Sequence, residues 1–205
     1  MRVFSIRSDS SDNVAAYLFY YREAKQFFIE LPDNADPWKT PMILSKFAER
    51  GETTVDHYWS GIWVKERIIP TDRQNLGQIL RENGMDSYDE FTLLTLAGGR
   101  CAQDDYYITE ISQDELPPMI AKRFRMKVSN IKILQYPNIY ISFKDGISGI
   151  CDAGRLMDNS SSFMALMKAN EKAFNNAKIM TDGYGIQWDD NMTVTYDKLY
   201  KNSTQ

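Results

Sequence analysis

Arginine, aspartate and glutamine side chains are concentrated between positions 67 and 105. The set consists of Arg67, Arg73, Gln74, Arg81, Arg100, Gln103, Asp104 and Asp105. A guanidinium group is planar and prefers bidentate partners, so these arginines can build an internal ion-pair network or a surface that grips a carboxylate or phosphate. We favour the network and keep the recognition surface as the hypothesis to test.

Two tryptophans upstream of this set extend the hypothesis of a recognition surface. Trp and Arg are over-represented among the residues that dominate the energy of protein–protein interfaces. We predict that a protein partner contacts Trp59, Trp63, Arg67, Arg73, Arg100, Gln103 and Asp105.

Asp104 and Asp105 could serve a different chemistry, because carboxylate oxygens are the ligands that hard cations prefer. A metal-dependent hydrolase using these two residues is therefore one alternative. Adjacent residues on a strand point to opposite faces, however, so the two carboxylates would not share one ion. We favour a salt bridge to a nearby arginine together with a turn cap.

The chain contains one histidine, His57, and we expect it to be a partly buried, hydrogen-bonded side chain. A single histidine excludes a zinc site built from several histidines. The sequence also lacks the nucleophile elbow, the phosphate-binding loop and the helical zinc-protease motif. We predict no catalytic residue, no metal site and no cofactor, and hence a non-enzymatic protein.

Residues 73–96 can also be read as a helix-turn-helix with Gly84 in the turn, which makes a DNA-binding transcriptional regulator a second alternative. The second helix of this motif would carry Asp and Glu where a major-groove reader needs Arg, Lys, Asn or Gln. The basic run 122–127 is a better candidate for phosphate contacts, although a solvated helix end is favoured there. Residues 1–110 hold 18 acids and 12 bases, which argues against general duplex binding, whereas residues 111–205 hold 10 acids and 12 bases.

The composition predicts a folded, cytoplasmic protein. Hydrophobic residues make up 43% and aromatic residues 13% of the 205-residue chain, enough for a packed core. The apolar runs are too short to span a bilayer, and the first residues turn polar too soon for a secretory signal. We expect Cys101 and Cys151 to be reduced, buried thiols.

Hydrophobic patterning predicts an α+β fold in two parts, residues 1–115 and 116–205. Aromatic-rich strands are expected at 3–7, 14–21 and 26–31. Four short helices should follow: one opening at Thr40 or Pro41, one over 54–66, one capped by Thr71 or Asp72, and one opening at Ser87 with Glu90 in a capping box. We expect these helices to form a compact bundle. Extended structure should return in the segment from Cys101 to Ile111.

The second part should begin with a short helix opened by Leu116-Pro117-Pro118. A hairpin turning at Lys144-Asp145-Gly146 follows, because Asp-Gly is a standard turn dipeptide. A helix containing Phe163, strands near 177–180 and 185–188, and a terminal helix over 195–200 complete the pattern.

This order resembles a small bacterial domain family of unknown function. The resemblance covers about the last seventy residues, and its marks are a hydrophobic strand, an Asp-Gly turn, a strand ending in Asp, a Phe-x-x-Leu helix and a Trp-containing strand leading to Leu-Tyr. These marks fall on Phe143, Asp145, Gly146, Asp152, Phe163, Leu166, Phe174, Trp188, Leu199 and Tyr200. The resemblance implies a small α+β fold, which some relatives fuse to a helix-turn-helix domain, and it transfers no activity. Together with the residues above, it leads us to expect a cytoplasmic bacterial adaptor or regulator that acts through a macromolecular partner.

Overall fold

The computed structural model describes residues 1–156, 171–189 and 192–203. The chain divides into two compact units. The first unit comprises Met1–Gly51 and His57–Glu115, and the second comprises Glu52–Asp56 and the chain from Leu116 onward. Segment 52–56 therefore lies, in sequence, between two parts of the first unit although it belongs to the second.

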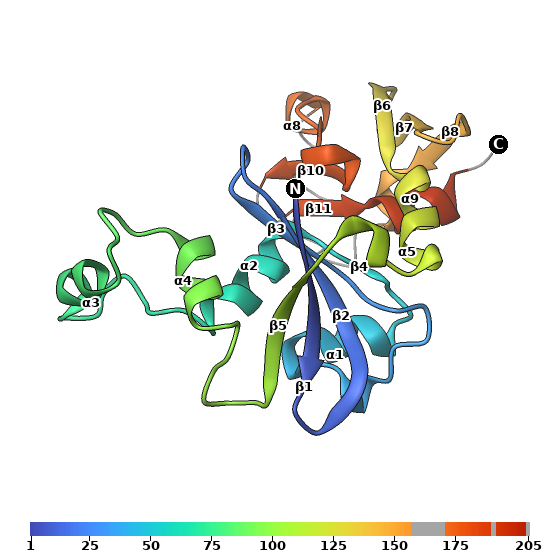
Figure 1. The fold of residues 1–205 in the computed structure, drawn as a ribbon. Helices are drawn as coiled ribbons and strands as arrows, with labels where there is room; N and C mark the ends of the chain where they lie inside the picture. The colour runs from blue at the N-terminus through green and yellow to red at the C-terminus, as the bar shows by residue number, and fades with distance from the viewer. Residues whose placement is uncertain (157–170, 190–191, 204–205) are drawn as a thin grey trace. The chain divides into compact units, whose positions relative to one another are not determined.

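An antiparallel sheet forms the centre of the first unit (Figure 1). Its strands there are β1 (Arg2–Ser8), β2 (Ser11–Tyr21), β3 (Gln26–Glu30) and β5 (Tyr106–Ile111). They are adjacent in the order β3-β2-β1-β5, so the last of them in sequence pairs with the first. Aromatic and β-branched residues favour a pleated surface, and the predicted strands are confirmed.

The helices of the first unit are α1 (Met42–Glu49), α2 (His57–Lys65), α3 (Leu76–Glu82) and α4 (Glu90–Leu96), with short 3-10 turns η1 (Pro37–Lys39) and η2 (Gln113–Glu115). The predicted helix over 54–66 starts too early, because the β-branched residues Thr54 and Val55 are extended and form β4 (Thr54–Val55). The predicted start at Ser87 is also displaced. Asp89 caps α4, and its Oδ1 accepts the backbone N–H of Thr92 at 2.8 Å.

The predicted bundle of four helices is wrong. Helix α2 packs against β3, and α4 places Phe91 on the sheet, where its ring stacks on Tyr20 at a centroid distance of 4.1 Å. Helix α3 has no buried residue, and Figure 1 shows it projecting away from the sheet. Helix α2 also contacts α1 and α4, but the sheet offers a broader apolar surface than another short helix does, so α2 and α4 pack on it and the four helices do not form a bundle of their own.

The second unit contains two three-stranded antiparallel sheets. One has the order β6-β7-β8 (Val128–Ile133, Asn138–Phe143, Ser148–Asp152) and the other β11-β10-β9 (Met192–Thr195, Gly185–Asp189, Lys178–Ile179). The described helical segments are α5 (Pro118–Arg123), η3 (Phe124–Met126), α6 (Ala153–Leu156), α8 (Glu171–Asn175), η4 (Thr181–Gly183) and α9 (Tyr196–Asn202).

Local sequence signals placed several of these elements correctly. The hairpin turn at Asp145-Gly146 is confirmed: the Asp145 carboxylate accepts the N–H of Ile147 at 3.0 Å and Gly146 adopts a φ of 89°. The opening of α5 and the terminal helix are confirmed as well. Strand β11 was not predicted. The predicted helix around Phe163 and Leu166 lies outside the described residues.

A buried lysine organises the core of the second unit. Lys127 is fully buried, and its Nζ lies 3.8 Å and 3.7 Å from the ring centroids of Phe124 and Tyr184. The same Nζ donates to Asp182 Oδ2 at 2.7 Å, and Lys144 donates to the other oxygen of that carboxylate. The charge of Lys127 is thus paired inside the domain, as a buried charge must be.

Candidate interaction surfaces

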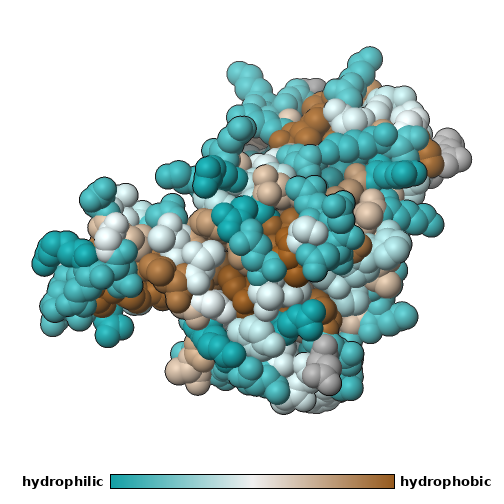
Figure 2. All heavy atoms as spheres, in the orientation of Figure 1, coloured by the Kyte–Doolittle hydropathy of each residue, from teal (hydrophilic) through white to brown (hydrophobic). Residues whose placement is uncertain are grey.

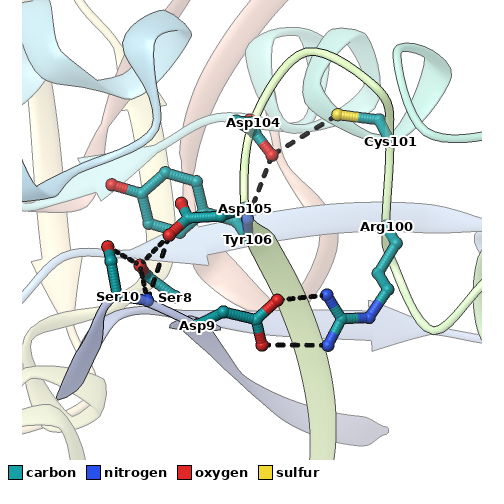
Figure 3. Close-up of polar contacts among 8 residues, drawn as sticks. All are labelled: Ser8, Asp9, Ser10, Arg100, Cys101, Asp104, Asp105 and Tyr106. Atoms are coloured by element: carbon teal, nitrogen blue, oxygen red, sulfur yellow. Dashed lines mark hydrogen bonds and ion pairs between the residues drawn. The ribbon is translucent and has the colours of Figure 1, made fainter.

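A cluster of polar contacts ties the β1–β2 turn to the loop that precedes β5 (Figure 3). The guanidinium of Arg100 makes a fork with the Asp9 carboxylate, at 2.6 Å and 3.0 Å. Asp105 Oδ2 accepts the Ser8 hydroxyl at 2.6 Å and the backbone N–H of Ser10 at 3.1 Å. We call these five residues the turn cluster.

The two carboxylates of the turn cluster are stabilised in their ionised form. The hydrogen bond from Arg100 lowers the pKa of Asp9, and the hydrogen bonds from Ser8 and Ser10 lower the pKa of Asp105. Both carboxylates accept hydrogen bonds, so neither is poised to take a proton from a substrate at neutral pH. Among the described residues, no group of three or more His, Cys, Asp or Glu side chains is placed to hold a metal ion.

The Asp104 side chain points away from the turn cluster and toward the interior of the first unit. One of its oxygens pairs with Arg67, whose side chain is fully buried, while the other accepts the backbone N–H of Tyr106 at 3.2 Å. Figure 3 shows Asp104 and Asp105 directed to different partners. The favoured interpretation, in which an arginine engages one of the two aspartates, is therefore confirmed.

Two residues that we predicted to contact a partner lie in the interior. Trp63 is fully buried, and the guanidinium of Arg67 stacks 3.9 Å from the centroid of its ring. Arg67 also donates to the carbonyl of Trp63 at 3.1 Å. They cannot serve as surface contacts because both are buried, whereas Trp59, which lies one turn earlier on the same face of α2 as Trp63, is 41% exposed.

The other predicted contacts are at the surface but do not form one set. Arg100 and Asp105 meet in the turn cluster, and Gln103 is exposed in the loop between them. Arg73 is exposed ahead of α3, where its Nε donates to Asn75 Oδ1 at 3.0 Å. Figure 2 shows hydrophobic side chains along the segments that connect α3 to the rest of the first unit.

The patterns in the sequence did not single out the most exposed large apolar side chains. Trp38 on η1 is 94% exposed, and Met42, the first residue of α1, is 88% exposed. The two elements pack together. Farther along α1, Phe47 makes an edge contact with Trp59, at a centroid distance of 6.2 Å. A tryptophan inside the polar, proline-rich loop 31–41 was the available signal.

The four cations of the basic run 122–127 differ in their exposure to solvent. Arg123 and Lys127 are buried, while Lys122 and Arg125 are exposed. Only two of the four cations are therefore accessible to a phosphate backbone. The segment 73–96 does contain two helices, but α3 projects from the unit instead of packing on α4 as the first helix of a helix-turn-helix would (Figure 1).

Comparison with known proteins identifies the second unit in part. The described strands and helices from β6 to α9 occur in the order that the resemblance requires, and its Phe-x-x-Leu helix falls outside the described residues. Residues 128–205 match the family described as protein of unknown function (DUF2442). The resemblance inferred from the hairpin, the Trp strand and the Leu-Tyr ending is thus confirmed. No curated protein and no solved structure matches the chain.

The DUF2442 match begins at Val128, so it leaves out α5, segment 52–56 and the whole first unit. None of the helices in the described parts of the chain is long and apolar enough to cross a membrane.

Proposed function

We propose that this chain is a non-enzymatic, cytoplasmic bacterial protein that acts as an adaptor or regulator by binding a protein partner. The observation that carries the proposal is the exposure of Trp38. The first unit buries Trp63 completely and yet leaves the Trp38 side chain 94% exposed. Tryptophan is the side chain most enriched at interface hot spots, since it brings the largest apolar area to a contact.

Exposed side chains of α1 and α2 add to this candidate contact, since α1 packs on η1 and its Phe47 contacts Trp59. Met42 adds a flexible apolar side chain that adapts to an irregular partner surface. Trp59 contributes a partly exposed ring from α2. We call Trp38, Met42 and Trp59 the aromatic surface, and we expect it to supply most of the binding energy. Arg73, Arg100, Gln103 and Asp105 stay as candidate polar contacts, whereas Trp63 and Arg67 are removed from the set.

Two alternatives have less support. A DNA-binding regulator would use 73–96 and 122–127, but half of the cations in the basic run are buried. A metal-dependent hydrolase would use Asp104 and Asp105, but these carboxylates engage different protein partners. The cytoplasmic location is supported by Cys101 and Cys151, both of which are free thiols.

The test is an affinity capture from nuclease-treated host lysate with the wild type and Trp38→Ala/Met42→Ala as baits. Leu96→Ala is the matched control, because Leu96 is 55% exposed on α4 and lies outside the aromatic surface. We expect a stoichiometric protein that the wild type and the control retain and the double variant loses. The purified protein should then bind the double variant at least about tenfold more weakly in calorimetry, since each 1.4 kcal/mol is a factor of ten. Equal retention by all three baits would refute the proposal, and recovery of nucleic acid but no protein in a parallel capture without nuclease would favour the DNA-binding alternative.

A further inference from the structure

Segment 52–56 is held in the second unit by side chains from three different elements. Its sequence is Glu-Thr-Thr-Val-Asp. The residues that hold it are Arg123 at the end of α5, Thr193 in β11, and Asp197 and Lys198 in the first turn of α9. We call these four residues the segment receptor.

An anionic and a cationic side chain of the segment receptor both contact the main chain of Thr53. Buried Asp197 accepts the Thr53 N–H at 3.4 Å, and buried Arg123 donates to the Thr53 carbonyl at 3.4 Å. Asp197 is itself oriented by the Thr195 hydroxyl, which donates to its other oxygen at 2.6 Å. The main-chain contacts match the donor and the acceptor of an extended residue, and the Thr53 hydroxyl also donates to Asp197 Oδ2 at 3.5 Å, so a hydroxyl side chain is recognised as well.

The flanking contacts add selectivity for side chains. Lys198 Nζ lies 3.0 Å from the carboxylate of Glu52, and the Thr193 hydroxyl donates to the carboxylate of Asp56. Each end of the segment thus presents an acid to a donor of the receptor. Between the two acids, Thr54 and Val55 are buried. The pattern that these contacts support is an acid, a hydroxyl residue and, three positions after the hydroxyl residue, a second acid.

We infer that the second unit is a receptor for an extended peptide segment of this pattern, and that residues 52–56 are its resident ligand in this chain. The inference is independent of the aromatic surface. Three of the four receptor residues, Thr193, Asp197 and Lys198, lie inside the DUF2442 match, whereas Arg123 and the bound segment lie outside it. The family domain therefore provides most of the receptor, and a segment distant in sequence provides the ligand.

A labelled peptide of residues 50–58 tests this inference on the full chain. A covalently attached segment has an effective concentration of the order of millimolar, so added peptide should not bind the wild type. Glu52→Lys/Thr53→Ala weakens the resident segment, and we expect fluorescence anisotropy to report binding of the peptide to this variant. The matched control, Glu49→Lys, changes an exposed acid of α1 outside the segment and should behave as the wild type does.

Lys198→Glu added to the weakened variant should abolish peptide binding, because it repels Glu52 of the peptide and pairs with the lysine of the resident segment. A peptide carrying Glu52→Lys should bind the weakened variant about tenfold more weakly than the native peptide. Absence of binding to a weakened variant that still melts cooperatively would overturn the inference. Equal binding to the wild type and the variant would overturn it as well.

A charge-exchange cycle keeps the inference testable if the weakened variant does not fold. Glu52→Lys and Lys198→Glu should each lower Tm, and the double variant should recover most of the loss. Failure of the double variant to recover would show that Lys198 does not recognise the acid of the segment, and would overturn the inference.

Discussion

Replacing Asp104 by Ala removes the carboxylate that pairs with Arg67 and leaves the guanidinium inside the first unit. The Arg67 side chain has no exposed surface, whereas the side chain of Asp104 is 25% exposed. After the substitution, Arg67 would keep its bond to the Trp63 carbonyl and its stacking on the Trp63 ring, and its remaining carboxylate would be Glu66, 3.7 Å away and about half exposed to solvent. Its Nε already has no hydrogen-bond partner among the described residues. Breaking a buried pair from one side in this way costs about 3–5 kcal/mol of the free energy of unfolding.

Arg67→Met, which removes the other partner, should cost less. The methionine side chain still packs on Trp63, and a sulfur–aromatic contact replaces part of the lost cation–π attraction. Asp104 would keep the N–H of Tyr106 and the Cys101 thiol at 3.2 Å and 3.4 Å, and water reaches its exposed part. We expect Arg67→Met to lower the free energy of unfolding by about 1–2 kcal/mol, as the loss of a charged hydrogen bond does when no unpaired charge is left buried.

Urea denaturation of the full chain followed by far-UV circular dichroism measures both costs. The double variant Arg67→Met/Asp104→Ala should be close to Arg67→Met alone, because no buried charge is left. Arg100→Met is the control, since its pair with Asp9 is about half exposed and should hardly move the midpoint. Equal costs for the two single variants, or a larger cost for Arg67→Met, would refute the reasoning that burial of the cation dominates.

Three further predictions concern thiols, glycines and pH. Burial raises the pKa of Cys151 to about 11. At pH 8, iodoacetamide should therefore label the more exposed Cys101 and reach Cys151 only after unfolding. Mass spectrometry of the labelled peptides measures both reactions, and equal labelling of the two cysteines in the native protein would contradict the prediction. Gly183→Ala would place a Cβ 2.1 Å from a backbone carbonyl oxygen of β6 at a φ of +78°, whereas Gly146→Ala meets no atom within 4 Å at +89°. Thermal melting should therefore show a severe loss for Gly183→Ala and a loss of only about 1 kcal/mol for Gly146→Ala. The pKa of Asp105 is lowered in the folded state. The ionised Asp105 therefore stabilises the folded protein above the unfolded-state pKa, and this contribution is lost as pH falls through the folded-state pKa. Asp105→Asn should make the free energy of unfolding fall less steeply at acidic pH, and an unchanged pH dependence would contradict the assignment.

Local patterns in the sequence determined much of the secondary structure. The strands β1 to β3, the Asp-Gly hairpin, the proline-opened α5 and the terminal α9 all follow from short-range preferences that act within a few residues. The order of these elements also indicated a resemblance to a small domain family of unknown function, and residues 128–205 match the family DUF2442. Predictions failed where a local preference competed with packing on a distant surface. Helix α2 begins at His57 because Thr54 and Val55 are extended, and α2 and α4 pack on the sheet while α3 projects away from it, so no four-helix bundle forms.

The tertiary structure alone decided which polar and aromatic residues are available to a partner. Trp59 and Trp63 are the same residue type and lie one turn apart on the same face of α2, yet one is 41% exposed and the other fully buried. The helix repeat does not determine which distant segments pack over each turn of that face. Trp38 gave no periodic signal, since a residue in an irregular loop has no helix or strand repeat from which exposure can be inferred. The contacts of segment 52–56 with residues 193–198 join positions remote in sequence, and charge pairing over such a separation is set by the fold and not by local pattern.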